Sequence, residues 1–423
     1  MEGESMSEWK EVRLGDVCNL YSGGTPNKNN KTYWNGNIPW ISAKSMYGDY
    51  IEDADLYITE EGLSNGSRLA PKGSILILTR GSGLYNRIPI CYTLKDVAFN
   101  QDVKRIESKD EDLYPNDLLY YILYANKKTI SSIIESTGIG AGKIDTDRFL
   151  NLPITIPPVY IQKDLMELFN AIFSKIETNN KLNEKLEEMA QAIFKSWFVD
   201  FEPFKDKPFH DTELGMIPEG WEVKRLCDIV DIIGGYSYKG NELKESTTAM
   251  CTIKNFERNG GFKINGYKEI IPSDKLKESQ ELSLFDVVVA HTDLTQNAEV
   301  IGNPAIILSK SNYDRIIFSM DLTKVISKNM NVSKSLLYCI LRNKRFKNHA
   351  LGYVNGTTVL HMSKKAVPDY MLAFPKDSVI LASLSKCFDS IFGRMHEIYE
   401  ENDRLASLRD TLLPRLMSGE LIV

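Results

Sequence analysis

Residues 165–197 read LMELFNAIFSKIETNNKLNEKLEEMAQAIFKSW, and this stretch decides the fold. Its apolar residues are spaced alternately by four and three, beginning with Leu165, Phe169 and Ile172. The same alternation returns 219 residues later, between Leu384 and Leu416. A seam of this kind, sustained over several heptads, is typical of a coiled coil. The pattern therefore predicts two helices of about 38 residues, each about 57 Å long.

Three asparagines occupy seam positions near the middle of these helices: Asn179, Asn183 and Asn402. If the helices pair antiparallel about a pseudo-two-fold axis, these amides lie close together at the centre. A buried polar residue in a seam lowers stability but fixes register and orientation. The simpler alternative is a pair of amphipathic helices, each lying on a separate globular core.

The segments that precede the two helices are also related to each other. WKEVRLGDV at 9–17 returns as WEVKRLCDI at 221–229, and GSILIL at 73–78 returns as FDVVVA at 285–290. The offset stays between 212 and 219 residues, which indicates duplication of a whole domain and its helix. Within the copies, 75–78 and 286–290 are predicted strands, while 118–124 and 336–342 are predicted short helices.

The predicted fold class is α+β, an internal duplication of a globular α/β domain plus a long helix. The two helices are predicted to form an antiparallel coiled coil about a pseudo-two-fold axis. Proline-marked boundaries at 153–158 and 368–375 close the globular parts. The predicted organisation is a domain at 8–157, a helix at 158–201, a linker at 202–214, a domain at 215–375 and a helix at 376–423.

Composition narrows the functional classes. The 423 residues carry a net charge of −6, which argues against indiscriminate nucleic-acid binding but allows local basic patches. No apolar run is long enough for a membrane helix, and no signal peptide is visible, so we expect a cytoplasmic protein without a membrane partner. The six cysteines form no C-x-x-C pair and the five histidines lack ligand spacing, so no metal is expected.

Motifs for catalysis are missing from the sequence. Residues 137–144, TGIGAGKI, differ from a phosphate-binding loop because Thr137 replaces the first glycine and Ile144 replaces the magnesium-binding Ser or Thr. Residues 156–160, IPPVY, lack the leading Asn or Asp of an adenine methyltransferase motif. The chain is therefore not expected to be an enzyme or to bind a cofactor itself.

Loops that combine donors, aromatic residues and glycine recur at matching positions of the two copies. Arg, Asn, Gln and Lys can form hydrogen bonds with base edges, while lysines also suit phosphates. The alternative for any single residue is a solvated polar loop or, for His291, packing at a strand end. The candidate DNA-binding residues of the first copy are Lys28, Lys31, Tyr33, Lys44, Arg80, Tyr85, Asn86, Arg87 and Lys143. Those of the second copy are Tyr236, Tyr238, Lys239, Lys254, Asn255, His291, Thr292, Gln296, Asn297, Asn355, Thr357 and Thr358.

Three local runs resemble a known family, the specificity (S) subunits of type I restriction–modification enzymes. AQAIFKSWFVDF at 190–201 resembles the end of the central helix of that family, and LRDTLLPRLMSGEL at 408–421 resembles the end of its C-terminal helix. NGTTVLHMSK at 355–364 resembles the run that closes its recognition domains. The first copy departs from this last run, with GAGKIDTD at 140–147.

The resemblance implies a non-catalytic subunit that reads a bipartite, asymmetric DNA target with two target-recognition domains. It also implies two methyltransferase (M) subunits, which bind S-adenosylmethionine, and motor–nuclease (R) subunits in the complex. Six apolar residues at the helix ends are the predicted partner-binding residues: Trp197, Phe198, Phe201, Leu412, Leu413 and Leu416. The alternative functions are a coiled-coil adaptor that binds protein only and, with less support, a fused methyltransferase.

Overall fold

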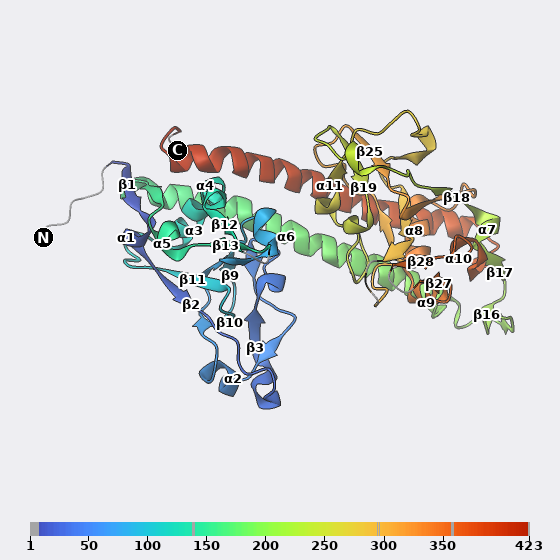
Figure 1. Cartoon of the computed structure of the whole chain (residues 1–423). Helices are drawn as coiled ribbons and strands as arrows, with labels where there is room; N and C mark the ends of the chain where they lie inside the picture. The colour runs from blue at the N-terminus through green and yellow to red at the C-terminus, as the bar shows by residue number, and fades with distance from the viewer. Residues whose placement is uncertain (1–7, 138–139, 294, 296, 357–358, 422–423) are drawn as a thin grey trace, which may run out of the picture. The chain divides into compact units, whose positions relative to one another are not determined.

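The computed structural model describes residues 8–137, 140–293, 295, 297–356 and 359–421. Its contacts divide into unit 1, Met1–Thr178 with Arg404–Val423, and unit 2, Asn179–Asp403. Both long helices predicted from the seam are confirmed as α6, Val159–Phe198, and α11, Ser378–Met417 (Figure 1). Each unit contains one globular part and a portion of each helix, so the chain is a mixed α/β protein with long helices.

Unit 1 is built on two main sheets. The larger has the order β2 (Cys18–Ser22), β11 (Val103–Ser108), β7 (Ile75–Leu78), β9 (Ile90–Thr93) and β4 (Tyr50–Ile51). The second has the order β5 (Tyr57–Ile58), β3 (Trp34–Ile41), β10 (Val97–Phe99) and β6 (Leu69–Ala70). All four residues of β7 are buried, as expected of a continuous apolar run in the middle of a sheet.

Two smaller sheets and five short helices complete unit 1. β1 (Lys10–Arg13) pairs with β14 (Pro153–Ile156), and β12 (Ile134–Ser136), β13 (Gly142–Ile144) and β8 (Arg80–Gly81) form a three-stranded sheet. Pro153 lies at the first position of β14, where proline is tolerated in a strand. The helices are α1 (Leu14–Val17), α2 (Glu60–Ser64), α3 (Asn116–Ala125), α4 (Lys127–Ser132) and α5 (Thr146–Leu150).

The core of unit 1 joins these sheets to the long helices. Phe169 and Phe173 of α6 are buried together with Leu413 and Leu416 of α11 and with the residues of β7. At a seam position of α11, Arg409 is also buried, and its Nη1 donates to Oδ2 of Asp49 at 3.1 Å. An ionised partner offsets part of the cost of burying this guanidinium.

Unit 2 has the same kinds of sheets. One has the order β18 (Val230–Gly234), β26 (Leu322–Ser327), β22 (Val287–Ala290) and β24 (Pro304–Ile306), and another has the order β20 (Lys268–Glu269), β19 (Thr248–Cys251), β25 (Arg315–Phe318) and β21 (Glu281–Leu282). β23 (Thr292–Asp293), β28 (Leu360–Met362) and β27 (Val354–Asn355) form a three-stranded sheet. β17 (Trp221–Arg225) pairs with β29 (Met371–Pro375), and β15 (Phe209–His210) with β16 (Ile217–Pro218).

The helices of unit 2 are α7 (Leu226–Ile229), α8 (Lys334–Arg342), α9 (Lys344–Leu351) and α10 (Ala366–Asp369). The predicted strands and short helices of both copies are confirmed as β7, β22, α3 and α8, with ends shifted by at most a few residues. No helix in the described part of the chain is long and apolar enough to cross a membrane. The division into units cuts both long helices, so the predicted domain boundaries stay a prediction.

The seam asparagines lie together in unit 2. Nδ2 of Asn179 donates to Oδ1 of Asn402 and to Oε2 of Glu401, both at 2.9 Å, and Nδ2 of Asn402 donates to Oδ1 of Asn180 at 2.9 Å. Asn183 is buried, and neither of its amide atoms has a hydrogen-bond partner among the described residues. The expected meeting of amides therefore involves Asn179 and Asn402, while Asn183 forms no hydrogen bond with either.

Candidate nucleic-acid interface

The three-stranded sheet of unit 1, β12–β13–β8, is called its small sheet, as β23–β28–β27 is that of unit 2. The small sheet of unit 1 brings two distant loop clusters together. Arg80 of β8 is the register partner of Lys143 of β13, and the Ile144 N–H donates to the Thr79 carbonyl at 2.9 Å. Gly142 makes this approach possible, because a Cβ there would lie 3.0 Å from the Leu84 side chain and 3.1 Å from that of Ile134. Two cationic residues that the sequence separates are thus neighbours on one sheet.

A third cation, missed from the sequence, belongs to the same place. Lys104 of β11 donates to Oγ of Ser22. Burial is the main reason that the pKa of Lys104 is lowered; Asp102 opposes this shift, and the charge of Arg80 adds to it. On the neighbouring register position, the guanidinium of Arg105 lies 4.8 Å from the ring centre of Tyr21. The dipeptide Lys104-Arg105 is a signal for a basic strand, but only the tertiary structure shows that the charge of Arg80 acts on Lys104.

Some candidates of unit 1 are exposed and others hold the fold. Lys28, Lys31, Lys44 and Asn86 are exposed, and Tyr85 is 51% exposed, whereas Tyr33 and Lys143 are partly buried. Arg87 is already engaged, because its Nη1 donates to the Tyr47 carbonyl at 2.6 Å and its Nη2 to that of Met46. Arg87 therefore fixes the 46–47 turn with two of its guanidinium nitrogens, and its contact with DNA stays a prediction.

The candidates near β3 form a separate group. Lys31–Tyr33 is a 3-10 turn directly before β3, capped by the side chain of Asn30, and Lys28 lies in the loop before it. The Tyr33 carbonyl accepts the N–H of Thr59, next to α2. Figure 1 shows α2 and β3 well away from β12 and β13 within unit 1. Unit 1 thus has two polar surfaces, one at the small sheet and one at the tip of β3.

The small sheet of unit 2 has the same pairing with different side chains. Thr292 of β23 and Asn355 of β27 are both register partners of His361 on the central strand β28. His361 is exposed and was not among the candidates, since the pattern of its segment did not mark it as a binding residue. Asn297 and Asn355 are exposed, while Gln296, Thr357 and Thr358 lie outside the described residues.

Four candidates of unit 2 are buried, and three of them form side-chain hydrogen bonds within the chain, so their contact with DNA stays a prediction. Oγ1 of Thr292 donates to Oδ1 of Asp321 at 3.1 Å, and the hydroxyl of Tyr236 donates to Oε2 of Glu242 at 2.9 Å. The amide of Asn255 accepts the Thr252 N–H and donates to the Lys263 carbonyl, both at 3.0 Å.

The fourth is His291, whose exposure is 8%. Burial lowers its pKa, and its Nε2 has no partner among the described residues. Local sequence did not distinguish these four side chains from solvated ones, because their partners lie far along the chain or in loops of irregular shape. Lys239 and Lys254 are exposed and Tyr238 is partly buried, so these candidates remain accessible.

Four of the six predicted partner-binding residues pack inside the chain, and their role in partner binding stays a prediction. Phe198 and Phe201 are 5% and 6% exposed, and their rings meet that of Trp221 edge-on at 5.3 and 5.2 Å between centroids. Phe201 has φ 50°, which turns the chain back over the end of α6. Leu413 and Leu416, at 1% and 5% exposure, belong to the core of unit 1. Their apolar character is explained by packing within the chain.

Two of the predicted partner-binding residues are less enclosed. Trp197 is partly buried, with its ring 5.7 Å from that of Phe204, and Leu412 is partly buried beside the core of unit 1. A role in partner binding stays a prediction for these two.

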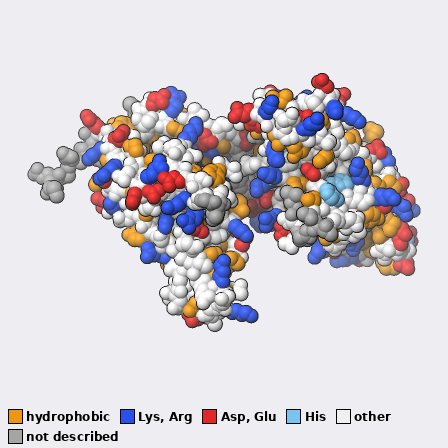
Figure 2. All heavy atoms as spheres, in the orientation of Figure 1, with side chains coloured by type: hydrophobic (Ala, Val, Ile, Leu, Met, Phe, Trp, Pro, Cys, Tyr) orange, Lys and Arg blue, Asp and Glu red, His pale blue; other side chains and the backbone are white. Residues whose placement is uncertain are grey.

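Basic side chains occur in small groups and do not form one large basic surface on the visible face (Figure 2). Figure 2 shows Lys and Arg side chains mixed with acidic ones over the visible face, without a continuous basic surface. This agrees with the net charge of −6. Electrostatic attraction to an anion would therefore come from local groups such as Arg80 and Lys104.

Comparison with known proteins agrees with this architecture. A family model described as the type I restriction modification DNA specificity domain matches residues 6–188. The specificity subunit of the type I restriction enzyme MjaIX from Methanocaldococcus jannaschii is 26% identical over 434 residues, covering 100% of this chain and 95% of the relative. The specificity subunit of EcoR124I/EcoR124II from Escherichia coli is 32% identical over 188 residues, covering 44% of each chain.

The fold has a solved counterpart. The S subunit of a type I restriction–modification system from M. genitalium aligns with a TM-score of 0.52 at 13% identity, over 98% of this chain and 97% of that one. The shared fold is mixed α/β with long helices. The chain is similar to specificity subunits of type I restriction–modification enzymes, and its residues 6–188 match the DNA specificity domain of that family.

Proposed function

We propose that this chain is the subunit that reads a bipartite, asymmetric DNA target, with unit 1 and unit 2 each contacting one half. The observation that carries the proposal is the pair of three-stranded sheets, β8–β13–β12 and β23–β28–β27. Each joins segments that are distant in the sequence, and each carries exposed polar side chains: Arg80 in unit 1, and Asn355 and His361 in unit 2. Arginine and lysine suit phosphates and guanine edges, and asparagine and histidine can reach base edges.

A duplicated origin of the two units is part of the proposal. Arg80 and Lys143 are paired as Thr292 and His361 are, and the Thr79 and His291 carbonyls both accept an N–H from the facing strand at 2.9 and 2.8 Å. The parallel pair of β3 with β10 in unit 1 has a counterpart in the parallel pair of β19 with β25 in unit 2, while unit 1 has a second parallel pair, β4 with β9. Two domains that diverged from one ancestor would keep the same strand register as well as the same order of elements.

An antiparallel coiled coil of α6 and α11 is the second part. In unit 1 the early residues Phe169 and Phe173 share a core with the late residues Leu413 and Leu416. In unit 2 the late residues Phe194 and Phe198 of α6 share a core with early residues of α11 such as Phe388. Early residues of α6 thus share a core with late residues of α11, and late residues of α6 with early residues of α11, which supports antiparallel pairing. The hydrogen bond between Asn179 and Asn402 supports a defined register.

The proposed partners are double-stranded DNA, two methyltransferase subunits and motor–nuclease subunits. S-adenosylmethionine would bind to the methyltransferase subunit and supply the methyl group there. The relatives' description as specificity subunits supports an assembly of this kind. Among the apolar residues at the helix ends, the partly exposed Trp197 and Leu412 are the ones that could contribute to docking.

The proposal is tested by mapping methylated adenines in DNA exposed to the chain in complex with its methyltransferase. We expect one split target, with two specified groups of bases and an unspecified gap. Complex lacking the chain is the control and should leave the DNA unmodified. Methylation at a single continuous motif, or modification that does not depend on the chain, would contradict the proposal. A chain that binds methyltransferase but no DNA would favour the adaptor alternative.

A further inference from the structure

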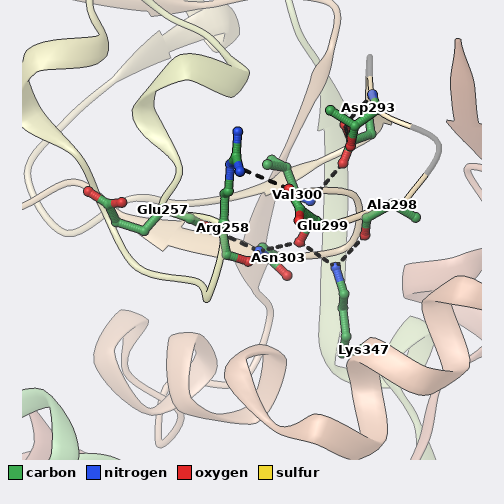
Figure 3. A network of polar contacts seen from close by, with 9 residues as sticks. Glu257, Arg258, Asp293, Ala298, Glu299, Val300, Asn303 and Lys347 are labelled. Atoms are coloured by element: carbon green, nitrogen blue, oxygen red, sulfur yellow. Dashed lines mark hydrogen bonds and ion pairs between the residues drawn. The ribbon is translucent and has the colours of Figure 1, made fainter. Parts of the chain in front are cut away.

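The segment after β23 in unit 2 is held by two charged side chains of opposite sign. The carboxylate of Asp293 collects N–H groups: its Oδ1 accepts from Thr295 and its Oδ2 from Val300, at 2.8 and 2.7 Å. The ammonium of Lys347, reaching from α9, collects carbonyls instead (Figure 3). The backbone N–H and C=O groups of an irregular segment have no hydrogen-bond partners on a neighbouring strand. The side chains of Asp293 and Lys347 act as those partners here.

Lys347 uses its full donor capacity. Its Nζ donates to the carbonyls of Ala298, Glu299 and Ile301 at 3.1, 3.0 and 2.5 Å, which matches the three hydrogens of an ammonium group. Burial lowers the pKa of Lys347 to about 8, against an attraction to Asp293 that raises it. A partly buried cation with three converging carbonyls is a specific contact and not a solvated surface lysine.

Other contacts fix the same segment. Nδ2 of Asn303 donates to the Glu299 carbonyl at 3.0 Å and lies 3.3 Å from those of Glu257 and Arg258. Gly302 has φ 77°, and a Cβ there would lie 2.8 Å from Cβ of Ala350 on α9. The segment therefore packs directly against α9, where Lys347 originates.

Ala298 adds evidence that the conformation is imposed. It has φ 49°, in the left-handed region that is unfavourable for a residue with a Cβ. Such strain persists where surrounding contacts determine the backbone. Among the contacts of Ala298 are the hydrogen bond from Lys347 to its carbonyl and the one from its own N–H to the Thr295 carbonyl at 3.3 Å.

We propose that Lys347 is a positioning residue for DNA recognition by unit 2: it holds 298–301 so that the adjoining small sheet and Asn297 keep the shape that contacts bases. The proposal rests on the proposed function. Lys347 does not touch DNA in this account; its three donors are all used by the protein.

Unit 1 lacks this arrangement at the corresponding place among its described residues. Gly81 occupies the register position of Asp293: each is the second residue of its edge strand, and each pairs with the central strand, Gly81 with Gly142 and Asp293 with Leu360. The neighbouring cation of α4, Lys127, lies 3.2 Å from the ring centre of Tyr124 instead. Loss of Lys347 should therefore affect one half of the target only.

The test compares Lys347→Met with Lys344→Met, a matched loss of an exposed lysine from the same helix, in the full chain with its methyltransferase. Hydrogen exchange of the free chain is measured alongside the methylation map. We expect Lys347→Met to speed exchange of the Val300 amide roughly ten- to hundredfold, because a buried hydrogen-bonded anchor is removed. The map should show relaxed base choice in one half, with the other half and the Lys344→Met variant unchanged.

A second variant guards against general misfolding. Asp293→Asn removes the opposite charge of the same anchor and should relax the same half of the target. Faster exchange with an unaltered target would overturn the positioning role, as would unaltered exchange or equal relaxation of both halves. Failure of the proposed function is distinguishable, because the unmutated complex would then show no split target at all.

Discussion

The two small sheets share their strand pairing and differ in charge. Unit 1 places Arg80 beside Lys143, and unit 2 places Thr292 beside His361 at the same register positions. In unit 1 both side chains are basic, whereas in unit 2 the threonine is buried and the histidine is exposed. One scaffold thus carries an electrostatic surface in one copy and a largely neutral one in the other.

Two cations of unit 2, Lys324 and Lys347, are used inside the protein. Lys104 of unit 1 corresponds in register to Thr323, which is buried. Lys324, one position further, forms an ion pair of 2.6 Å with Asp286. Lys347 is bound to three carbonyls. From this comparison we expect unit 1 to gain affinity from phosphate contacts and unit 2 to gain specificity from a rigid segment.

The largest expected effect is on unit 1. Replacing Arg80 and Lys143 by alanine should weaken binding of a target duplex ~10- to 100-fold and reduce the slope of log affinity against log salt by about 1.8, or ~0.9 for each phosphate that is no longer neutralised. Titrations at several salt concentrations measure both quantities. Lys72→Ala, an exposed lysine elsewhere in unit 1, is the control. An unchanged slope would mean that these two cations do not neutralise phosphates.

His361→Ala should have a smaller and different effect. Removing one hydrogen bond to a base edge costs about 0.5–1.5 kcal/mol, and the salt slope should stay constant because no permanent charge is removed. Competition between duplexes that differ in one half of the target measures the discrimination. If His361→Ala lowered the salt slope as much as the unit 1 variant, the charge contrast between the two sheets would not hold.

The seam provides an internal contrast of its own. Asn179 is hydrogen-bonded, whereas both amide atoms of the buried Asn183 lack partners among the described residues. Asn179→Leu should destabilise the chain and Asn183→Leu should stabilise it, each by about 1–2 kcal/mol. Urea unfolding followed by circular dichroism compares the two. Equal destabilisation by both would show that Asn183 has partners in solution.

The smallest effect concerns pH and Lys347. Burial lowers its pKa from 10.5 to about 8, while Asp293 favours and Arg342 disfavours its charge. The unfolded chain therefore holds more protons than the folded chain between about pH 8 and 10.5, so this lysine makes stability rise with pH in that window. Relative to Lys347→Met, the unmutated chain should gain unfolding free energy as pH rises from about 8 to about 10. The nearby Arg258–Glu299 ion pair is present in both proteins, so its contribution cancels in the difference between their unfolding free energies. A difference that shrinks over this range would contradict the assigned direction.

The elements were largely predictable and the contacts were not. The seam from Leu165 to Trp197 located α6 to within a few residues, because heptad spacing is a local property. Arg87, Asn255 and Thr292 were expected to face DNA, yet each bonds a group that the sequence does not place beside it. Composition of a loop identifies potential donors, but strand register and irregular backbone determine which donors remain free.

The same reason explains the residues that were missed. Lys104 and His361 lie within strands, where alternation assigns a face but not a neighbour in the next strand. Lys347 lies on a short helix, where an exposed lysine is the usual expectation. Its role depends on three carbonyls of a segment about fifty residues earlier, which only the tertiary structure brings to it.

The central claim is that the two units read separate halves of one target, and an exchange of domains tests it most directly. Residues 8–157 are replaced by the corresponding domain of a relative, and methylated adenines are mapped for the complex with its methyltransferase. We predict that one half of the split target changes to that of the donor protein while the other half stays as it was. A change in both halves, or in neither, by a folded and methyltransferase-bound chimera would contradict independent reading by the two units.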